Sequence, residues 1–233
     1  AVAEASLHNY GVKVPITIVP TAVPLPDPML VSPEARRSAR AQWDIPEGCP
    51  LLLYVGRIAQ EKNIELLLDA FDDCRQRFPD ARLLIVGGGP HLEAAAKYAN
   101  SIASRGRVIF AGPMAHDELA PVYAAADLFV FASTTETQGL VMAEARAAGT
   151  PCVIARGGGA SETIEDGEDG IIVEPDRDAF AAAVTALLEN RERLSVMRES
   201  CLRRARLYTP EAMTEAVLRV YCAVTNPPPS GAA

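Results

Sequence analysis

The feature that most constrains the fold of this chain is an alternation of short apolar runs with segments of helical period. Seven runs have the length and composition of strands: ITIVP, LLLYVG, RLLIVGGG, VIFAG, LFVFAS, CVIAR and GIIVEP. Segments such as IELLLDAFDDCRQRF and GLVMAEARAA lie between them, with apolar residues three and four positions apart. The alternation predicts right-handed βαβ units, and therefore a Rossmann-like α/β sandwich of three layers with a mostly parallel sheet and helices on both faces.

Helical segments also flank the alternating part. SPEARRSARAQW predicts a short helix with Ser32 as N-cap and Pro33 at its first position. After residue 175 no strand is expected, and helices are predicted over about 177–190, 191–206 and 210–225, the last with Thr209 as N-cap. The final residues, NPPPSGAA, are rich in proline and are expected to be disordered.

Composition excludes several classes of protein. The 233 residues carry a formal charge of −8, which disfavours a nucleic-acid partner because phosphate backbones are bound by basic patches. There is no run of eighteen apolar residues, so no membrane-spanning helix is expected. The five cysteines are scattered without a CxxC pair, as in reduced thiols of a cytoplasmic protein. The chain begins AVAEASLHNYG, and we expect it to be a piece of a longer protein.

Ligands of an open parallel sheet bind outside the carboxyl ends of its strands, so the residues after each predicted strand are the informative ones. GRIAQEK follows the strand LLLYV. Gly56 would allow a tight turn. The planar guanidinium of Arg57 and the ammonium of Lys62 would bind phosphate oxygens. The alternative is a pair of solvated surface charges beside Glu61.

VGGGP ends the next strand with a glycine turn at Gly87. It has only half of the G-x-G-x-x-G dinucleotide fingerprint, and no acidic residue ends the following strand to hold a ribose. A dinucleotide dehydrogenase is therefore disfavoured. Both a ligand-binding turn and plain turn glycines remain open here.

ETQGLVMAE places two carboxylates, Glu136 and Glu144, around a predicted helix start. The amides of Gly139, Leu140 and Val141 would lack intrahelical acceptors and would form an anion site. A carboxylate can accept two hydrogen bonds, one from each of two neighbouring sugar hydroxyls. Two such carboxylates flanking an anion site match the layout of a nucleotide diphosphate sugar.

Two carboxylates repel a diphosphate, and Arg57, Lys62 and the helix N-terminus would offset that repulsion. The alternative is that Glu136 is merely exposed and that Glu144 pairs with Arg146 or another neighbour on the helix.

Together, YVGRIAQEKNIELLLDAF, LLIVGGGP, VIFAGPMAHDELAPVYAAADLFVFAS and TETQGLVMAEARAAGTPCVIARGGGASETIEDGEDGIIVEP resemble the nucleotide-binding half of the retaining glycosyltransferases of family four, or group 1, which have the GT-B fold. The resemblance covers about residues 14 to 190. It implies that Glu136 contacts the transferred sugar and that Glu144 contacts the ribose hydroxyls. The turn Gly157 to Ser161 matches a further family turn, for which we expect a mainly structural role.

The same resemblance implies roles for the remaining positions. Arg57 and Lys62 would bind the diphosphate and assist its departure, and with Glu136 they would be the catalytic residues. Gly139 and Leu140 would donate backbone amides to the diphosphate. Met114, in GPMAH, would lie beside the nucleobase. The expected donor is a nucleotide diphosphate sugar, with UDP-hexose as first choice. The expected reaction is hexose transfer with retention and without a cofactor or metal.

The resemblance also implies a domain organisation. Residues 1–13 would be an interdomain segment, 14–206 the donor-binding domain, 207–225 a helix crossing back to an N-terminal domain, and 226–233 a disordered tail. The missing domain would bind the acceptor, so this piece alone is expected to be inactive. The whole protein would be cytoplasmic, with possible peripheral association at the inner face of a membrane.

Two alternatives stay open at this point. A sugar-nucleotide epimerase has a related fold and donor pocket, but it needs acidic residues from another domain. A non-catalytic nucleotide-sugar sensor or assembly module would keep the pocket and lack the chemistry. Release of free nucleotide by the whole protein separates an enzyme from a sensor.

Overall fold

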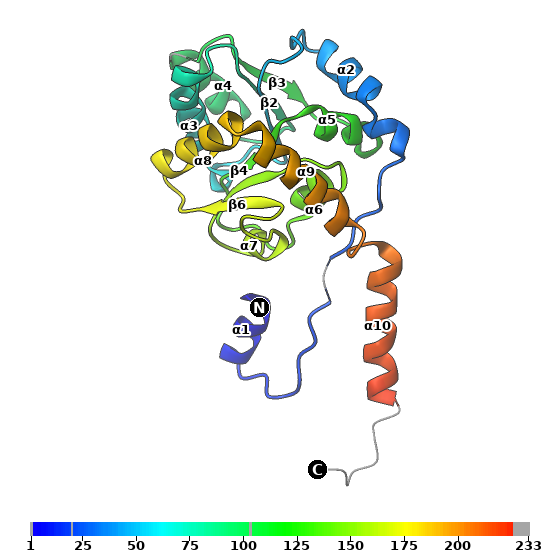
Figure 1. The fold of residues 1–233 in the computed structure, drawn as a ribbon. Coiled ribbons are helices and arrows are strands. Elements are labelled where there is room, and N and C mark those ends of the chain that lie inside the picture. The colour runs from blue at the N-terminus through cyan, green and yellow to red at the C-terminus, as the bar shows by residue number, and fades with distance from the viewer. Residues whose placement is uncertain (1, 20, 103, 226–233) are drawn as a thin grey trace.

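The computed structural model describes residues 2–19, 21–102 and 104–225 (Figure 1). A single six-stranded sheet lies at its centre, in the order β3-β2-β1-β4-β5-β6, with every pairing parallel. The strands are β1 (Leu51–Val55), β2 (Arg82–Val86), β3 (Val108–Gly112), β4 (Leu128–Phe131), β5 (Cys152–Ala155) and β6 (Gly170–Val173). The strand order reverses direction between β1 and β4, as in a doubly wound Rossmann fold. The predicted fold class is confirmed.

Helices cover both faces of the sheet (Figure 1). One face carries α3 (Ile64–Arg77), α4 (Leu92–Ser101) and α8 (Arg177–Glu189). The other carries α5 (Leu119–Ala125), α6 (Leu140–Ala147) and α9 (Arg191–Ala205), with α2 (Pro33–Ala41) packed beside α5. Shorter elements are η1 (Pro28–Val31), η2 (Gln60–Lys62), η3 (His116–Glu118) and α7 (Ala160–Thr163), and the chain ends are α1 (Val2–Asn9) and α10 (Pro210–Thr225).

The core is centred on the two middle strands. Every residue of β1 and of β4 is buried, whereas the edge strand β3 is only partly buried. Aromatic rings stack within this layer, with the ring centroids of Tyr54 and Phe131 5.8 Å apart. Continuous apolar burial of this kind is what a parallel sheet covered on both faces requires.

The predicted helix caps are confirmed. The Ser32 hydroxyl accepts a hydrogen bond from the Ala35 amide at 3.2 Å, and the Thr209 hydroxyl accepts one from the Ala212 amide at 3.3 Å. The helices after residue 175 also lie where the sequence predicts them. α7 and α1 are additional short helices that the periodicity did not indicate.

One predicted strand is wrong. Residues 16–19, the described part of ITIVP, form neither helix nor strand, and Ile18 is exposed. An apolar run becomes a strand only when a neighbouring strand supplies hydrogen-bond partners. Figure 1 shows this segment running away from the sheet, where no strand lies beside it.

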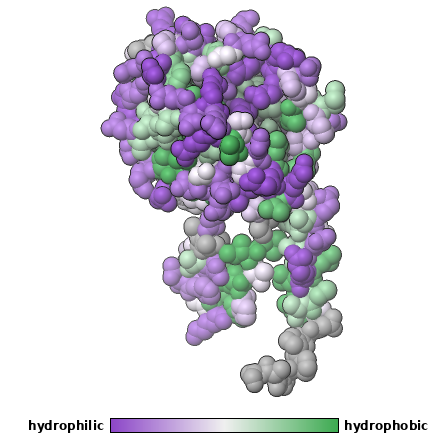
Figure 2. Space-filling view, in the orientation of Figure 1, coloured by the Kyte–Doolittle hydropathy of each residue, from purple (hydrophilic) through white to green (hydrophobic). Residues whose placement is uncertain are grey.

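The N-terminal segment and α10 project from the α/β body (Figure 1). No described side chain of α10 is buried, and its Leu218, Tyr221 and Val224 are exposed. Figure 2 shows apolar surface gathered on these projecting parts. No helix in the described part of the chain is long and apolar enough to cross a membrane. The predicted disorder of 226–233 lies outside the described residues.

Candidate functional site: the carboxyl edge of the sheet

A shallow groove runs across the carboxyl ends of β1, β2 and β3. Its lining includes Gly56, Arg57, Gly87 and Met114, four of the residues predicted for the site. They come from the loops that follow three adjacent strands, so the parallel sheet itself brings them together.

The floor of this groove is made by two backbone segments in close contact. Gly87 has φ 138°, and a Cβ there would lie 1.9 Å from the carbonyl oxygen of Gly56. Any side chain at position 87 would therefore push the two loops apart. The turn after β1 is fixed further by the Tyr54 hydroxyl, which donates to the Arg57 carbonyl at 3.0 Å.

The Arg57 side chain lies at the rim of the groove. It is 60% exposed, and its guanidinium contacts the carboxylate of Glu61. This is the surface pairing that the sequence left open as an alternative. An exposed pair of this kind contributes little to stability, so Arg57 is available to a stronger anion.

Lys62 and Glu136 are joined directly, although they are far apart in the sequence. The Lys62 ammonium donates to a Glu136 carboxylate oxygen at 3.0 Å, with the side chains 14% and 22% exposed. The ammonium also lies 5.6 Å from the centre of the Phe131 ring, within the range of a cation–π contact. Two of the three residues predicted to be catalytic therefore form one contact at the ends of β1 and β4.

The other oxygen of Glu136 faces the backbone of its own loop. It accepts hydrogen bonds from the amides of Thr137 at 3.1 Å and Gln138 at 3.3 Å, and the Gly139 amide lies at 3.5 Å. Burial alone would raise the pKa of this carboxyl, but the bonds from Lys62 and the backbone amides outweigh it and lower the pKa below its ordinary value. The surroundings of the Glu136 side chain, an ammonium and backbone amides, thus favour its charged form.

The helix start predicted at Gly139 is confirmed. Gly139 adopts the left-handed conformation, with φ 69°, and α6 begins at Leu140. Within the described part of the chain, the amides of Leu140 and Val141 donate to no protein acceptor. Open amides at a helix N-terminus, next to the positive end of the helix dipole, form an anion-binding position.

Glu144 lies one and a half turns into α6 and lines a neighbouring hollow. One carboxylate oxygen accepts a hydrogen bond from the Tyr123 hydroxyl at 2.8 Å, and the other lies 3.6 Å from Nδ1 of His116. Burial, followed by the nearby Glu144 charge, raises the pKa of Tyr123, so the phenol stays a donor. Leu119 lines both this hollow and the groove, which makes the two adjacent.

Sequence reasoning missed Tyr123 and His116. The available signal for Tyr123 was a hydroxyl on the otherwise apolar face of HDELAPVYAAA, because a buried tyrosine needs a hydrogen-bond partner. The suggested pairing of Glu144 with Arg146 is wrong. Residues two apart on a helix point to different sides, and Arg146 faces away from Glu144.

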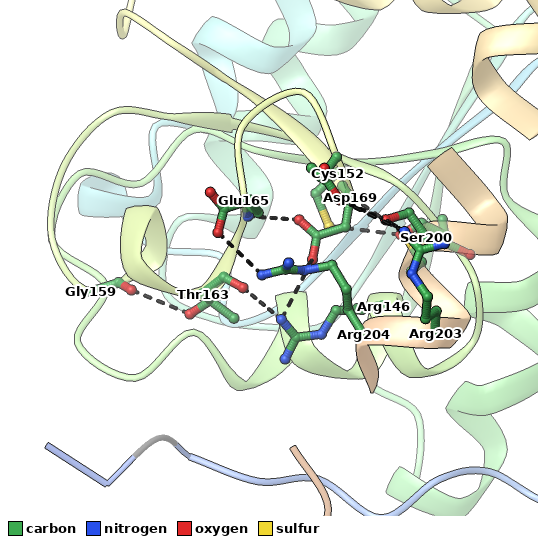
Figure 3. Close-up of polar contacts among 12 residues, drawn as sticks. Arg146, Cys152, Gly159, Thr163, Glu165, Asp169, Ser200, Arg203 and Arg204 are labelled. Carbon is green, nitrogen blue, oxygen red and sulfur yellow. Dashed lines mark hydrogen bonds and ion pairs between the residues drawn. The ribbon is translucent and has the colours of Figure 1, made fainter. Parts of the chain in front are cut away.

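Arg146 belongs to a buried network behind the site (Figure 3). Its guanidinium donates to the Thr163 carbonyl at 2.8 Å and lies 3.6 Å from the carboxylate of Asp169. That carboxylate also accepts a bond from Arg204 of α9 at 3.1 Å. The network ties α6 to α7, to the loop before β6 and to α9.

The turn Gly157 to Ser161 supports the Glu136 loop from below. The Gly159 amide donates to the Glu136 carbonyl at 2.6 Å, and a Cβ at Gly159 would lie 2.0 Å from the Thr137 carbonyl oxygen. These contacts agree with the expected structural role of the turn. Glu162, which follows it, is the acidic residue in the first turn of α7.

Comparison with known proteins places this geometry in a family. The family described as "Glycosyl transferases group 1" matches residues 35–204. An alpha-monoglucosyldiacylglycerol synthase of Streptococcus pneumoniae is 36% identical over 185 residues, which cover 78% of this chain and 42% of that protein. A D-inositol 3-phosphate glycosyltransferase of a Nocardioides species is 35% identical over 208 residues, covering 81% and 45%. The chain thus spans less than half the length of these relatives.

Solved structures agree with this assignment. A sucrose-phosphate synthase of Thermosynechococcus elongatus has a TM-score of 0.79 and 30% identity, covering 96% of this chain and 56% of that one. A glycosyltransferase of Rickettsia africae has a TM-score of 0.85 at 19% identity, covering 97% and 62%, and shows the shared fold. The chain therefore belongs to the group 1 glycosyltransferases of GT-B fold.

Proposed function

We propose that this chain is the donor-binding part of a retaining hexosyltransferase, and that it binds a nucleotide diphosphate sugar along the carboxyl edge of its sheet. The observation that carries the proposal is the convergence of Lys62, Glu136 and the open N-terminus of α6 beside a groove that contains Arg57. This arrangement offers positive charge to a diphosphate and carboxylates to the hydroxyls on either side of it.

The Lys62–Glu136 contact suggests how the site responds to the donor. A diphosphate placed against Arg57 and the amides of Leu140 and Val141 would draw the Lys62 ammonium toward it. Glu136 would then lose its cationic partner and could accept hydrogen bonds from the transferred sugar. Arg57, Lys62 and the helix N-terminus would stabilise the charge that develops on the departing diphosphate. These groups supply positive charge from the protein itself, and we propose transfer without a metal.

Glu144 is proposed to accept hydrogen bonds from the ribose, because Tyr123 holds its carboxylate at the wall of the adjacent hollow. Met114 would lie beside the base. UDP-hexose is our first candidate for the donor. GDP-mannose is the second, because a relative 35% identical to this chain, from Mycolicibacterium smegmatis, is named as GDP-mannose-dependent.

The acceptor would be bound largely by a further domain, since the relatives extend over more than twice the matched length. The apolar face of α10 is suited to contact such a domain. The name of the streptococcal relative points to a lipid acceptor. We accordingly propose that the whole protein works in the cytoplasm, with peripheral association at the inner face of the membrane.

The test is calorimetric titration of this chain with UDP, GDP and ADP, and then with the matching sugar nucleotides. We expect one diphosphate to bind with a micromolar to millimolar Kd. Glu144→Ala should weaken that binding, while Glu174→Ala, in an exposed ion pair with Arg156, should leave it unchanged. Equal binding by wild type and Glu144→Ala would contradict the ribose assignment. If the whole protein bound donor but never released free nucleotide, a sensor would replace the enzyme.

A further inference from the structure

A second charged groove lies at the opposite end of the sheet, before the first residues of β1 and β4. Its lining includes Arg36 and Arg40 of α2, Arg191 of α9, and the carboxylates of Glu47 and Asp127. The proposed donor site lies at the carboxyl ends of the strands, so the body of the sheet separates the two places. None of the residues assigned to donor binding lines this groove.

Arginines on α2 and α9 converge on the carboxylate of Asp127. Arg36 and Arg40 are four residues apart on α2, and Arg191 and Arg198 are seven apart on α9, so each pair shares a helix face. Between the helices lies Asp127, whose carboxylate oxygens are 2.9 Å from Arg40, 3.5 Å from Arg198 and 3.7 Å from Arg191. The same carboxylate accepts a bond from the Leu51 amide at 2.9 Å.

Three arginines thus lie within 4 Å of the Asp127 carboxylate, whereas Arg36 interacts with its charge without forming an ion pair. In the described part of the chain the guanidinium of Arg36 makes no hydrogen bond or ion pair, whereas its neighbour Arg37 pairs with Glu34 at 2.9 Å. The groove is lined by four arginines, Arg36, Arg37, Arg40 and Arg191, and by two carboxylates, Glu47 and Asp127, so its lining carries a surplus of two positive charges. This surplus occurs in a chain whose formal charge is −8.

The surroundings add to this positive character. Pro33 and Arg191, the first residues of α2 and α9, both line the groove, so two helix N-termini direct partial positive charge into it. Burial lowers the pKa of Arg36; the Asp127 charge opposes this shift and the Arg40 charge adds to it. Burial and the Arg36 charge lower the pKa of Arg198 to about 10, against the opposing effect of Asp127. Burial is the larger cause of both shifts, and the close spacing of the arginines adds to it.

We propose that this groove binds a phosphate dianion, such as inorganic phosphate or a phosphate monoester, through Arg36 with Arg40 and Arg191 in support. A guanidinium presents paired N–H donors that match two oxygens of a phosphate group. The space is about 300 Å³, well above the ~30 Å³ that one water molecule occupies in the liquid. A dianion would balance the surplus charge.

The test is a calorimetric titration of this chain with inorganic phosphate. Arg36→Ala should weaken phosphate binding more than tenfold. Arg37→Ala removes the same charge from the same groove, but from a residue already paired with Glu34, and should change binding less than threefold. Arg57→Ala, at the proposed donor site, should leave this binding intact. Equal losses in Arg36→Ala and Arg37→Ala, or a loss only in Arg57→Ala, would overturn the proposal.

Thermal unfolding gives a second readout. Phosphate should raise the Tm of wild type and leave that of Arg36→Met unchanged. In phosphate-free buffer Arg36→Met should unfold at the same temperature as wild type or higher, because it removes an unbalanced charge. A lower Tm there, with the phosphate response retained, would make Arg36 structural.

Vesicles distinguish a lipid headgroup from a soluble phosphate ester. Binding to phosphatidic acid vesicles that exceeds binding to phosphatidylcholine vesicles, and that is lost in Arg36→Ala, would identify a headgroup. Binding of inorganic phosphate alone would identify a soluble ester. Binding of neither probe would contradict the site.

Discussion

Glu136 and Asp169 are both carboxylates in contact with a basic side chain, yet they lie in different surroundings. Glu136 and Lys62 are 22% and 14% exposed beside an open groove, and each has one charged partner. Asp169 and Arg146 are 0% and 3% exposed (Figure 3). Asp169 accepts hydrogen bonds from Arg204 and the Glu165 amide, and Arg146 donates to the Thr163 carbonyl, although its buried Nε has no hydrogen-bond partner in the described part of the chain. A ligand can take over one partner of the first pair, whereas the second pair is closed to ligands.

The difference separates two uses of the same chemistry. A buried ion pair is stable only when its partners are complete, so the Asp169 network can hold α6 in place but cannot exchange partners. A part-exposed pair at the ends of strands can exchange one partner for a phosphate or a sugar hydroxyl. α6 connects the two, because Gly139 and Glu144 face the site while Arg146 faces the network.

The largest effect is expected from breaking the buried Arg146–Asp169 pair. Asp169→Ala would leave Arg146 buried without its carboxylate, and removing one partner of a buried pair lowers the free energy of unfolding by about 3–5 kcal/mol. Denaturant unfolding of the variant measures this loss. The matched control is Glu174→Ala, which removes an exposed partner of Arg156 and should change stability by less than about 1 kcal/mol. Equal stabilities of the two variants would show that the network does not hold the fold.

A smaller effect is expected for Arg57 at the carboxyl edge of the sheet, and it concerns ligand binding and not folding. Arg57→Ala should weaken nucleoside diphosphate binding by about 1.5–3 kcal/mol, the range for a hydrogen bond to a charged group. Its free energy of unfolding should remain close to that of wild type, because Arg57 is exposed. Calorimetry and denaturant unfolding on one preparation separate the two quantities. Unchanged affinity would remove Arg57 from the diphosphate site.

The smallest effect is the pH dependence of stability that arises from the Lys62–Glu136 pair. The pKa of Glu136 is lowered in the folded chain, so the folded state binds fewer protons there than the unfolded state. Its contribution to stability is present above the ordinary carboxyl pKa and is lost as the pH falls through the folded value. Wild type should therefore lose stability more steeply than Glu136→Gln as the pH is lowered below about 4.5. Parallel curves for the two proteins would contradict the favoured charge on Glu136.

The sequence predicted the sheet and the open edge better than the closed network. Apolar runs marked all six strands, and residues just after strands indicated the groove, because parallel strands bring those positions together. ITIVP had the composition of a strand but lacked a partner strand, which local composition does not show. The partner of Arg146 was also hidden, because Asp169 lies in a distant loop and nothing in its local sequence indicates the contact.

The most direct test of the central claim is a ¹H–¹⁵N correlation spectrum of this chain recorded during titration with UDP and with GDP. We expect one of them to shift the backbone amide signals of Gly56, Gly87, Leu140 and Val141, while those of Asp169 and Arg204 stay in place. Shifts confined to the groove around Arg36, or equal shifts at Asp169, would contradict a donor site at the carboxyl edge of the sheet.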